Sequence, residues 1–196
     1  MKNHSLFVET PDHKLIRQAQ SGNRSALNQL FGQWYPRVYN MAFRYFHDED
    51  LAADVSQQTF VAIQKSLPQL RDPQAFKSWL FRTAINCCHT LARRRHRHQA
   101  SMEVISLQPK RDQPVTPYQE LDRKERSRIV LAALQEIPEE QREVIVMKEY
   151  EGLKFREIAE ILQLSENTVK SRLYYGLKAM RKLLEDCRLH KDLLYE

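Results

Sequence analysis

The sequence predicts an all-α protein: two small helical domains joined by a flexible tether, with a helix-turn-helix in the C-terminal domain. Only 4 of the 196 residues are glycine, 42% are hydrophobic, and β-branched residues rarely occur in runs, which together disfavour a sheet. Apolar residues recur at helical spacing over two stretches. The polar stretch between them contains three prolines and favours an extended chain over a third domain. The boundaries that we predict are 1–98 for the first domain, 99–120 for the linker and 121–196 for the second domain.

Two helices are predicted at the start of the first domain. Leu15, Ile16 and Ala19 share one face of a short helix, and Ser21-Gly22-Asn23 ends it. The segment after it carries an apolar face so wide that it must contribute to the core. The residues of that face are Leu27, Leu30, Phe31, Trp34, Val38, Met41, Ala42 and Tyr45.

A polar break, His47-Asp48-Glu49-Asp50, precedes a third helix. Acidic residues at a helix start interact favourably with the helix dipole, so capping is the simplest role for this cluster. A metal site is the other interpretation, but the four residues are consecutive and nothing fixes them around one point. The third helix repeats every four positions, at Leu51, Val55, Thr59, Ile63 and Leu67.

A fourth helix is predicted to begin at Asp72-Pro73, with Asp72 as the N-cap and Pro73 at the first helical position. Its main buried face comprises Phe76, Leu80, Thr83, Ala84, Cys87 and Leu91. Beside that face runs a stripe made of Trp79, Arg82, Asn86 and Arg93. An aromatic ring, cations and an amide on one stripe can stack a base, hold phosphates and read a base edge, as single-strand binding requires. For Trp79, a place in the core is the other interpretation.

The second domain is predicted to place a scaffold beneath a helix-turn-helix. One helix covers Leu121–Leu134 and ends before Ile137-Pro138. Helical spacing restarts at Glu139 and continues to Tyr150, and Gly152 permits the turn that follows.

The helix-turn-helix itself lies between Leu153 and Leu184. Its first helix has an apolar face, and after a three-residue turn Ser165 is a good N-cap for the second helix. The buried stripe of that second helix comprises Val169, Leu173, Leu177, Met180 and Leu184. An advance of about 100° per residue places the following side chains on the opposite face or its flanks: Asn167, Lys170, Ser171, Arg172, Tyr175 and Lys178.

This polar face has the chemistry of a groove-reading helix. Short hydrogen-bonding side chains occupy its centre and cations occupy its edges. In a major groove, bases are read in the middle and phosphates line the rims, so the pattern favours duplex DNA binding. A plain helical hairpin with a solvated polar face is the alternative.

Charge and cysteine usage narrow the function classes. The net charge is +6, residues 165–191 hold seven Lys/Arg against three acidic residues, and a dense basic run covers 93–98. Such local excess favours a polyanion partner. The three cysteines, Cys87, Cys88 and Cys187, lack framework spacing, so we expect neutral thiols and neither a metal site nor a disulfide framework. The N-terminus lacks an apolar signal core and no apolar run could span a bilayer, so we expect a cytoplasmic protein without membrane insertion.

Three phrases, in order along the chain, resemble bacterial sigma factors of the sigma-70 family. They read DEDLAADVSQQTFVAIQKSL, FKSWLFRTAINCCHTLARRR and IPEEQREVIVMKEYEGLKFREIAEILQLSENTVKSRLYYGLKAM. Within that family the chain resembles the short extracytoplasmic-function group, from roughly Leu15 to Leu184. One phrase alone is weak evidence, since many regulators share such a helix-turn-helix, but three in this order are highly specific.

The resemblance implies a transcription initiation factor and a division of labour. In the family, the first domain binds the clamp helices of RNA polymerase and captures the melted −10 promoter element. The second domain holds the −35 element as duplex and contacts the flap of the β subunit. The implied partners are core RNA polymerase, through its β and β′ subunits, promoter DNA, and an anti-sigma factor that occludes both domains. We expect no enzymatic activity, no catalytic residues, no metal and no cofactor.

The resemblance also implies three sets of contact residues. Core polymerase binding falls to Asp54, Gln57, Gln58 and Thr59. The loop 69–75, with Phe76, Arg82 and Asn86, falls at the −10 element. Trp79 and Arg93 of the helical stripe, together with Lys77, complete the predicted −10 set. Reading of the −35 element falls to Asn167, Thr168, Lys170, Ser171, Arg172, Tyr175 and Lys178, which agrees with the helical-wheel argument. Relatives commonly carry a Glu in place of Gln58 and a cation near Tyr175, so individual contacts differ there.

Two other functions compete with this one. A stand-alone helix-turn-helix regulator would use the same C-terminal helices, but its first domain would need a ligand pocket or a dimer face. A metal-dependent nuclease would use the residues 47–50, but no second carboxylate or histidine motif joins them at suitable spacing.

Overall fold

The computed structural model describes residues 11–101 and 118–194, and every regular element within these ranges is a helix. The first range contains α1 (Pro11–Gln20), α2 (Arg24–Phe46), α3 (Glu49–Ser66), the 3-10 turns η1 (Leu67–Gln69) and η2 (Pro73–Ala75), and α4 (Phe76–Ser101). The second range contains α5 (Tyr118–Glu136), α6 (Glu139–Ile145), the π-helical turn η3 (Val146–Tyr150), α7 (Phe155–Leu162) and α8 (Glu166–Leu194). The all-α prediction is confirmed.

Helix extends into both ends of the stretch expected to be a linker. α4 continues to Ser101 and α5 begins at Tyr118, whereas the expected linker covers 99–120. The Arg, Gln and Ala residues at the end of α4 have high helix propensity, so the helix continues there without an apolar stripe. The centre of the expected linker, 102–117, lies outside the described residues.

Side-chain caps begin the helices where the sequence predicts them. Asp48 accepts a hydrogen bond from the backbone N–H of Leu51 at 3.1 Å, which caps α3. Ser165 accepts one from the backbone N–H of Thr168 at 3.1 Å, which caps α8. Asp72 also caps the turn after it, although that turn, η2, is a 3-10 turn that leads into α4.

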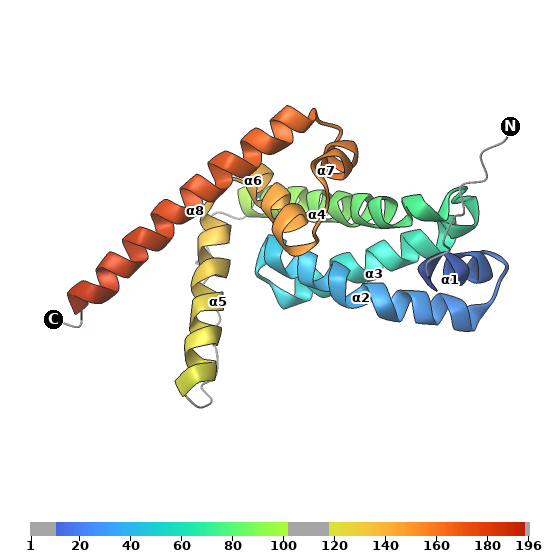
Figure 1. Cartoon of the computed structure of the whole chain (residues 1–196), viewed down its shortest axis with the longest axis horizontal. Coiled ribbons are helices and arrows are strands. Elements are labelled where there is room, and N and C mark those ends of the chain that lie inside the picture. Colours follow the sequence, from blue (N-terminus) through green and yellow to red (C-terminus); the bar gives the residue numbers. More distant parts are fainter. Residues whose placement is uncertain (1–10, 102–117, 195–196) are drawn as a thin grey trace, which may run out of the picture.

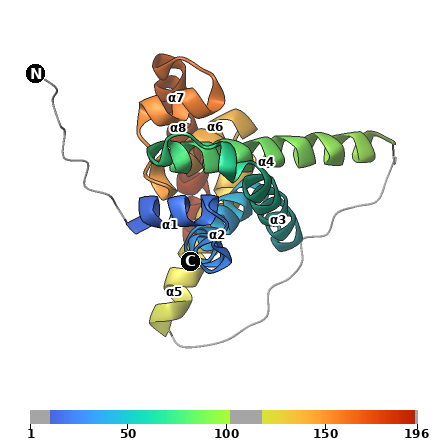
Figure 2. The same cartoon turned by 90° about the vertical axis from the view of Figure 1, so that its right-hand side faces the viewer.

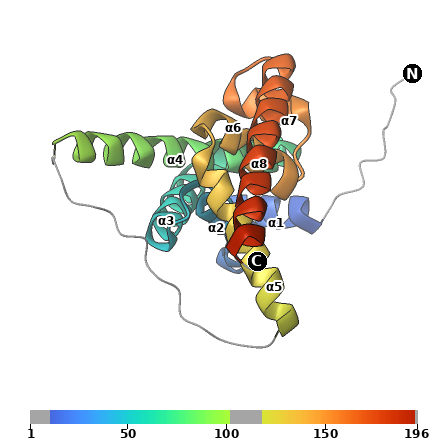
Figure 3. The same ribbon diagram turned by 90° about the vertical axis from the view of Figure 1, so that its left-hand side faces the viewer.

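Helix α4 lies at the centre of the molecule. It has α1, α2 and α3 on one side and α6 and α7 on the other, and its last turns extend beyond both groups (Figures 2 and 3). Trp34 of α2 packs edge-on against Phe76 and Phe81 of α4, with ring centroids 5.7 and 6.2 Å apart. The buried face of α4 is wider than expected, because α4 also buries Phe81, which packs on α2, together with Ile85, Cys88 and Ala92. Thr83, Cys87 and Leu91 are only half-buried.

The two predicted domains pack on each other and share one hydrophobic core. Helix α4 contacts α7, and α2 contacts α5, α6 and η3, while α5 and α8 project beyond the first domain (Figure 1). At this junction the Arg142 guanidinium of α6 donates to four backbone carbonyl groups at 2.7–3.1 Å. They belong to Leu134, Gln135, Ile137 and Tyr45. One side chain therefore satisfies carbonyl groups at the ends of both α5 and α2, which lack partners within their helices.

The buried stripe of α8 differs from the prediction at one position. Leu177 is 43% exposed, whereas the neighbouring Gly176 is buried. A Cβ atom built on Gly176 would lie 2.8 Å from Cδ1 of Ile145 and 3.0 Å from Cβ of Gln141 in α6. Because α8 approaches α6 so closely at Gly176, Leu177 turns towards the surface. The other members of the predicted stripe are buried or half-buried.

Candidate nucleic-acid interface

One face of α8 gathers six of the side chains predicted to read duplex DNA. All six are exposed: Asn167, Thr168, Lys170, Ser171, Tyr175 and Lys178. The turn before α8 fixes this face in place, since Gln163 adopts a left-handed conformation with φ 57° and Ser165 caps the helix. We call these six residues the outer face of α8. It carries two cations and four uncharged hydrogen-bonding groups, which suits a groove with phosphates at its rims.

Arg172, the seventh residue predicted to read duplex DNA, does not lie on the outer face of α8. Its guanidinium is bound to two carboxylates of α6, Glu140 at 3.1 Å and Glu143 at 3.2 Å. Glu143 is only 4% exposed. The structure therefore places Arg172 between α8 and its scaffold, and not on the outer face.

Two exposed tyrosines come directly after the centre of the outer face along α8. Tyr174 and Tyr175 are 63% and 59% exposed, and their rings meet edge-on with centroids 5.4 Å apart. Sequence reasoning missed Tyr174, which the helical wheel places between the buried stripe and the polar face. Its aromatic character, unusual at a flank position of a surface helix, is the signal that could have identified it.

The residues predicted to bind core polymerase separate into two kinds. Asp54, Gln57 and Gln58 are exposed on α3 and form one patch. Thr59 is completely buried, so in this structure its side chain does not reach the surface where a partner would bind. Its hydroxyl faces the Cys87 thiol of α4 but forms no hydrogen bond of normal geometry among the described residues.

The residues predicted to contact the −10 element also differ in how far they are buried. Phe76 is buried between Trp34 and Trp79, with ring centroids 5.7 and 6.1 Å away, so it belongs to the core. Lys77 and Trp79 are half-buried. Asn86 and Arg93 are exposed, and Arg82 is half-buried. Arg82, Asn86 and Arg93 are therefore accessible for direct contact with DNA, whereas Phe76 is not.

The stripe of α4 faces the second domain. Arg82, Asn86 and Arg93 line a cleft of about 710 Å³ whose opposite wall is formed by α6, α7 and α8. Arg82 also donates a hydrogen bond across this cleft to the backbone carbonyl of Glu160 in α7. Arg82, Asn86 and Arg93 thus share this cleft with the α6 carboxylates of Glu139, Glu140 and Glu143.

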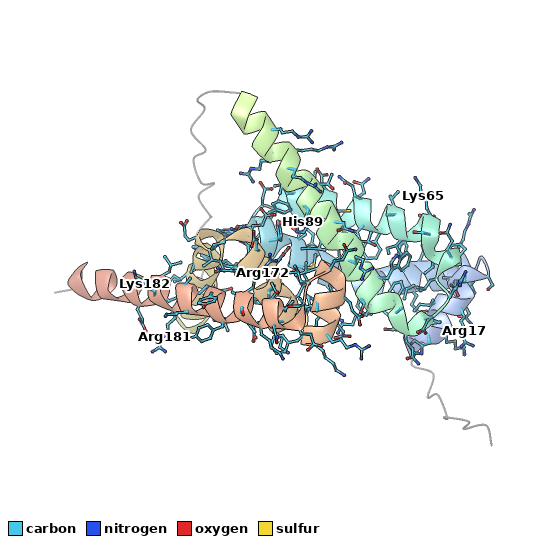
Figure 4. The ribbon with its side chains drawn as sticks, turned by 90° about the horizontal axis from the view of Figure 1, so that it is seen from above. Arg17, Lys65, His89, Arg172, Arg181 and Lys182 are labelled. Carbon is cyan, nitrogen blue, oxygen red and sulfur yellow. The ribbon has the colours of Figure 1, made fainter. Side chains whose placement is uncertain are left out.

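Among the side chains that the structure describes, two ion pairs join the domains. Nε2 of His89 on α4 lies 2.7 Å from the Glu143 carboxylate, so this carboxylate is shared between His89 and Arg172. Figure 4 labels His89 on α4 and Arg172 on α8. On the α2 side, the Arg37 guanidinium donates to the Glu151 carboxylate and to the Glu151 carbonyl, both at 3.1 Å. Neither pair was expected from the sequence, because its members lie 54 and 114 residues apart.

Two of the cysteines, Cys87 and Cys88, are described side chains, and both are free thiols on α4. Burial raises the pKa of the Cys87 and Cys88 thiols, so both are neutral near pH 7. In the part of the chain that the structure describes, no three His, Cys, Asp or Glu side chains gather as metal ligands would. Across the same ranges, no helix is both long and apolar enough to cross a bilayer.

Two family models match the chain. Residues 30–98 match the model described as Sigma-70 region 2, and residues 127–180 match the one described as Sigma-70, region 4. The first match covers most of α2 to α4, and the second covers the end of α5 to the middle of α8.

Relatives extend the likeness over nearly the whole chain. RNA polymerase sigma-H factor of Pseudomonas aeruginosa is 27% identical over 187 residues, which covers 92% of this chain and 97% of the relative. ECF RNA polymerase sigma-E factor of Haemophilus influenzae is 29% identical over 177 residues, which covers 86% and 93%.

Solved structures share the fold. CnrH, solved in complex with the cytosolic domain of CnrY, aligns with a TM-score of 0.67 and 29% identity over 89% of this chain and 97% of that chain. The sigma factor RpoE, solved with the anti-sigma factor NepR from Bartonella quintana, aligns with a TM-score of 0.64 over 81% and 96%. Its identity of 20% supports the fold alone.

Proposed function

Because the chain belongs to the sigma-70 family, in its extracytoplasmic-function group, we propose that it binds core RNA polymerase and directs it to specific promoters. The observation that carries this proposal is the presence of both family regions, in order, on one chain. A stand-alone regulator needs a helix-turn-helix but has no use for a region 2 domain. That alternative is therefore not favoured.

We assign −35 reading to the outer face of α8. Ser171 and Asn167 lie towards its centre, where short donors and acceptors can reach base edges. Lys170, on a flank of the face, supplies charge for the phosphates at a rim, and Lys178 adds a second cation further along the same face. Arg172 is assigned to the scaffold, since its guanidinium is held by Glu140 and Glu143.

We assign −10 capture to the stripe of α4. Asn86 can donate to and accept from a base edge, while Arg82 and Arg93 can hold phosphates of the melted strand. Trp79, half-buried beside them, offers part of its ring for stacking. Phe76 supports this surface from within the core, where it meets Trp34 and Trp79.

We assign polymerase binding to the exposed patch of α3, Asp54, Gln57 and Gln58. These side chains lie on the surface away from α4, so a large partner can reach them without displacing the core. An anti-sigma factor is the further partner that we propose, because CnrH, which is 29% identical, was solved in complex with a second protein, the cytosolic domain of CnrY. Core polymerase and promoter DNA place this work in the cytoplasm.

The test is reconstituted transcription. The purified protein is mixed with a cognate core polymerase and fractionated by size, and transcripts started by the complex on genomic DNA are sequenced. We expect co-elution with the core and initiation from a limited promoter set. A protein that fails to co-elute, yet binds duplex DNA sequence-specifically by itself, would instead be the stand-alone regulator.

A further inference from the structure

Phe155, the first residue of α7, has two lysine ammonium groups over its ring. Nζ of Lys148 lies 4.8 Å from the ring centroid, and Nζ of Lys170 lies 5.7 Å from it. Both distances allow a cation–π attraction, which extends to about 6 Å. Lys148 belongs to η3 and Lys170 to α8. One aromatic ring therefore brings together cations from the elements before and after α7.

The turn before α7 explains how Lys148 reaches this ring. In the π-helical turn η3, the backbone N–H of Glu151 donates to the carbonyl of Val146 at 3.2 Å. Gly152 follows with φ 63°, a left-handed conformation that glycine adopts without strain, so the chain reverses there. The Lys148 ammonium donates to the Leu153 carbonyl at 3.3 Å. This hydrogen bond holds the lysine side chain back over the reversed segment that leads into α7.

Neither ammonium group is neutralised by a carboxylate of the protein. Among the described residues, no Asp or Glu forms an ion pair with Lys148 or Lys170. Two other cations of this domain are paired, Arg172 with carboxylates of α6 and Arg156 with Glu160 at 3.2 Å. Two like charges that share one ring repel each other, and an anion that contacts both relieves the repulsion. The lysine pair therefore favours an anionic partner.

The location of the two lysines suits a phosphate of duplex DNA. Lys170 is exposed at the edge of the outer face of α8, and Lys148 is half-buried beside the start of α7. Helices α7 and α8 contact each other and meet at one end of the molecule (Figure 1). In a helix-turn-helix the first helix crosses the DNA backbone while the second reads the groove. Cations between the two helices thus lie where a strand that borders the groove would pass.

We propose that Phe155 is a positioning residue for promoter binding, and that its ring holds Lys148 and Lys170 in place for one phosphate of the −35 duplex. The inference rests on the proposed function, from which it takes the −35 duplex as the ligand. It adds Lys148, which lies outside the predicted −35 set, as a phosphate contact. Ordering a long side chain on binding costs entropy, and the ring lowers this cost because both lysines are held before DNA arrives.

The test measures binding of full-length variants to a labelled pool of random duplex DNA at several salt concentrations. Phe155→Leu keeps an apolar side chain but removes the ring, and we expect roughly three- to tenfold weaker binding. The log–log salt slope should keep its wild-type value, because both lysines still reach the phosphate once DNA is bound. Phe155→Tyr restores a ring and should restore the affinity. Circular dichroism checks that each variant is folded.

Lysine variants separate the effect of charge from that of position. Lys148→Ala should weaken binding and lower the salt slope by about one unit, because it removes a phosphate contact. Arg156→Ala is the matched control, since Arg156 is already paired with Glu160, and its slope should stay close to the wild-type value. When Lys148→Ala and Lys170→Ala are both present, adding Phe155→Leu should not weaken DNA binding further. Additive losses would show that Phe155 acts only through packing.

A measurement without DNA tests the same geometry independently. The ring current of Phe155 should shift the ε-methylene protons of Lys148 and Lys170 upfield in the NMR spectrum of the free protein, and Phe155→Leu should abolish the shift. Inorganic phosphate should move these signals at a lower concentration in the wild type than in Phe155→Leu.

The outcomes distinguish failure of this inference from failure of the proposed function. Absent ring-current shifts, an unchanged salt slope in Lys148→Ala, or additive losses with Phe155→Leu would overturn the inference while the wild type still binds duplex. A wild-type protein that shows the ring-current shifts and binds inorganic phosphate, but binds no duplex, would overturn −35 reading and with it the assignment of this lysine pair to DNA.

Discussion

The guanidinium of Arg172 donates to the buried carboxylate of Glu143 at 3.2 Å, and this contact ties the recognition helix α8 to α6. A second bond, to Glu140 at 3.1 Å, fixes the same guanidinium from the exposed side. Since Glu143 is almost inaccessible to water, its charge needs these donors in order to stay buried.

Arg172→Ala should therefore act on stability more than on DNA recognition. Loss of the donor leaves Glu143 with His89 alone, and we expect a loss of about 2 kcal/mol in the free energy of unfolding. Urea unfolding followed by circular dichroism measures it. Lys170→Ala is the control, because Lys170 is exposed and its loss should change stability by less than about 0.5 kcal/mol. Equal stability of the two variants would return Arg172 to the DNA-contact set.

Ser171→Ala and Lys170→Ala should affect −35 binding differently. Ser171 lies at the centre of the outer face, so its loss should change base preference at one position of the element. Lys170 lies at the edge, so its loss should weaken binding to all sequences and lower the log–log salt slope by about one unit. Affinities for a set of single-base promoter variants, measured at several salt concentrations, separate the two effects. Equal losses on every sequence with an unchanged slope would contradict this geometry.

Asn86→Ala should impair open complexes while sparing earlier steps. The amide is exposed on the stripe and can bond the edge of a flipped base, which recovers part of the few kcal/mol that unstacking costs. Co-elution with core polymerase and binding to −35 duplex should stay at the wild-type level. Permanganate footprinting on an ordinary promoter measures opening, and a mismatched promoter should restore it only in part. Normal footprints from Asn86→Ala would remove its capture role.

Thr59→Val should be neutral or slightly stabilising. The Thr59 hydroxyl is buried without a hydrogen bond of normal geometry, so an apolar group of the same shape removes the cost of desolvating it. We expect up to about 1 kcal/mol of added stability in thermal or urea unfolding, and wild-type affinity for core polymerase. Gln57→Ala, on the exposed patch of α3, is the comparison and should weaken polymerase binding without changing stability. A polymerase defect in Thr59→Val would show that α3 is rearranged in the complex.

Local signals in the sequence were sufficient for most of the fold. The caps at Asp48 and Ser165 and the apolar periodicity of α2, α3 and α8 depend on residues close in sequence. The exposure of six residues on the outer face of α8 follows from the same periodicity. These features were predictable because neighbours a few residues apart determine them.

Contacts between the domains were not predictable in this way. Ile85 is buried where α4 faces α6 and α7 across the cleft, and no periodicity within α4 indicates that cover. Arg172 has the sequence position of a DNA contact, yet a carboxylate 29 residues away holds it. Leu177 is exposed because a glycine beside it lets α8 approach α6. Each exception depends on a partner distant in sequence.

The four carbonyl bonds of Arg142 determine where the molecule can bend. Three of them join α6 to the end of α5 and to the bend after it, and only the bond to Tyr45 crosses to the first domain. If the domains separated, that single bond would be lost and the other three would persist. Helices α5 and α6 would then move as one rigid unit. A change in the angle of α5 would therefore also reorient the promoter-reading helix α8, which packs on α6.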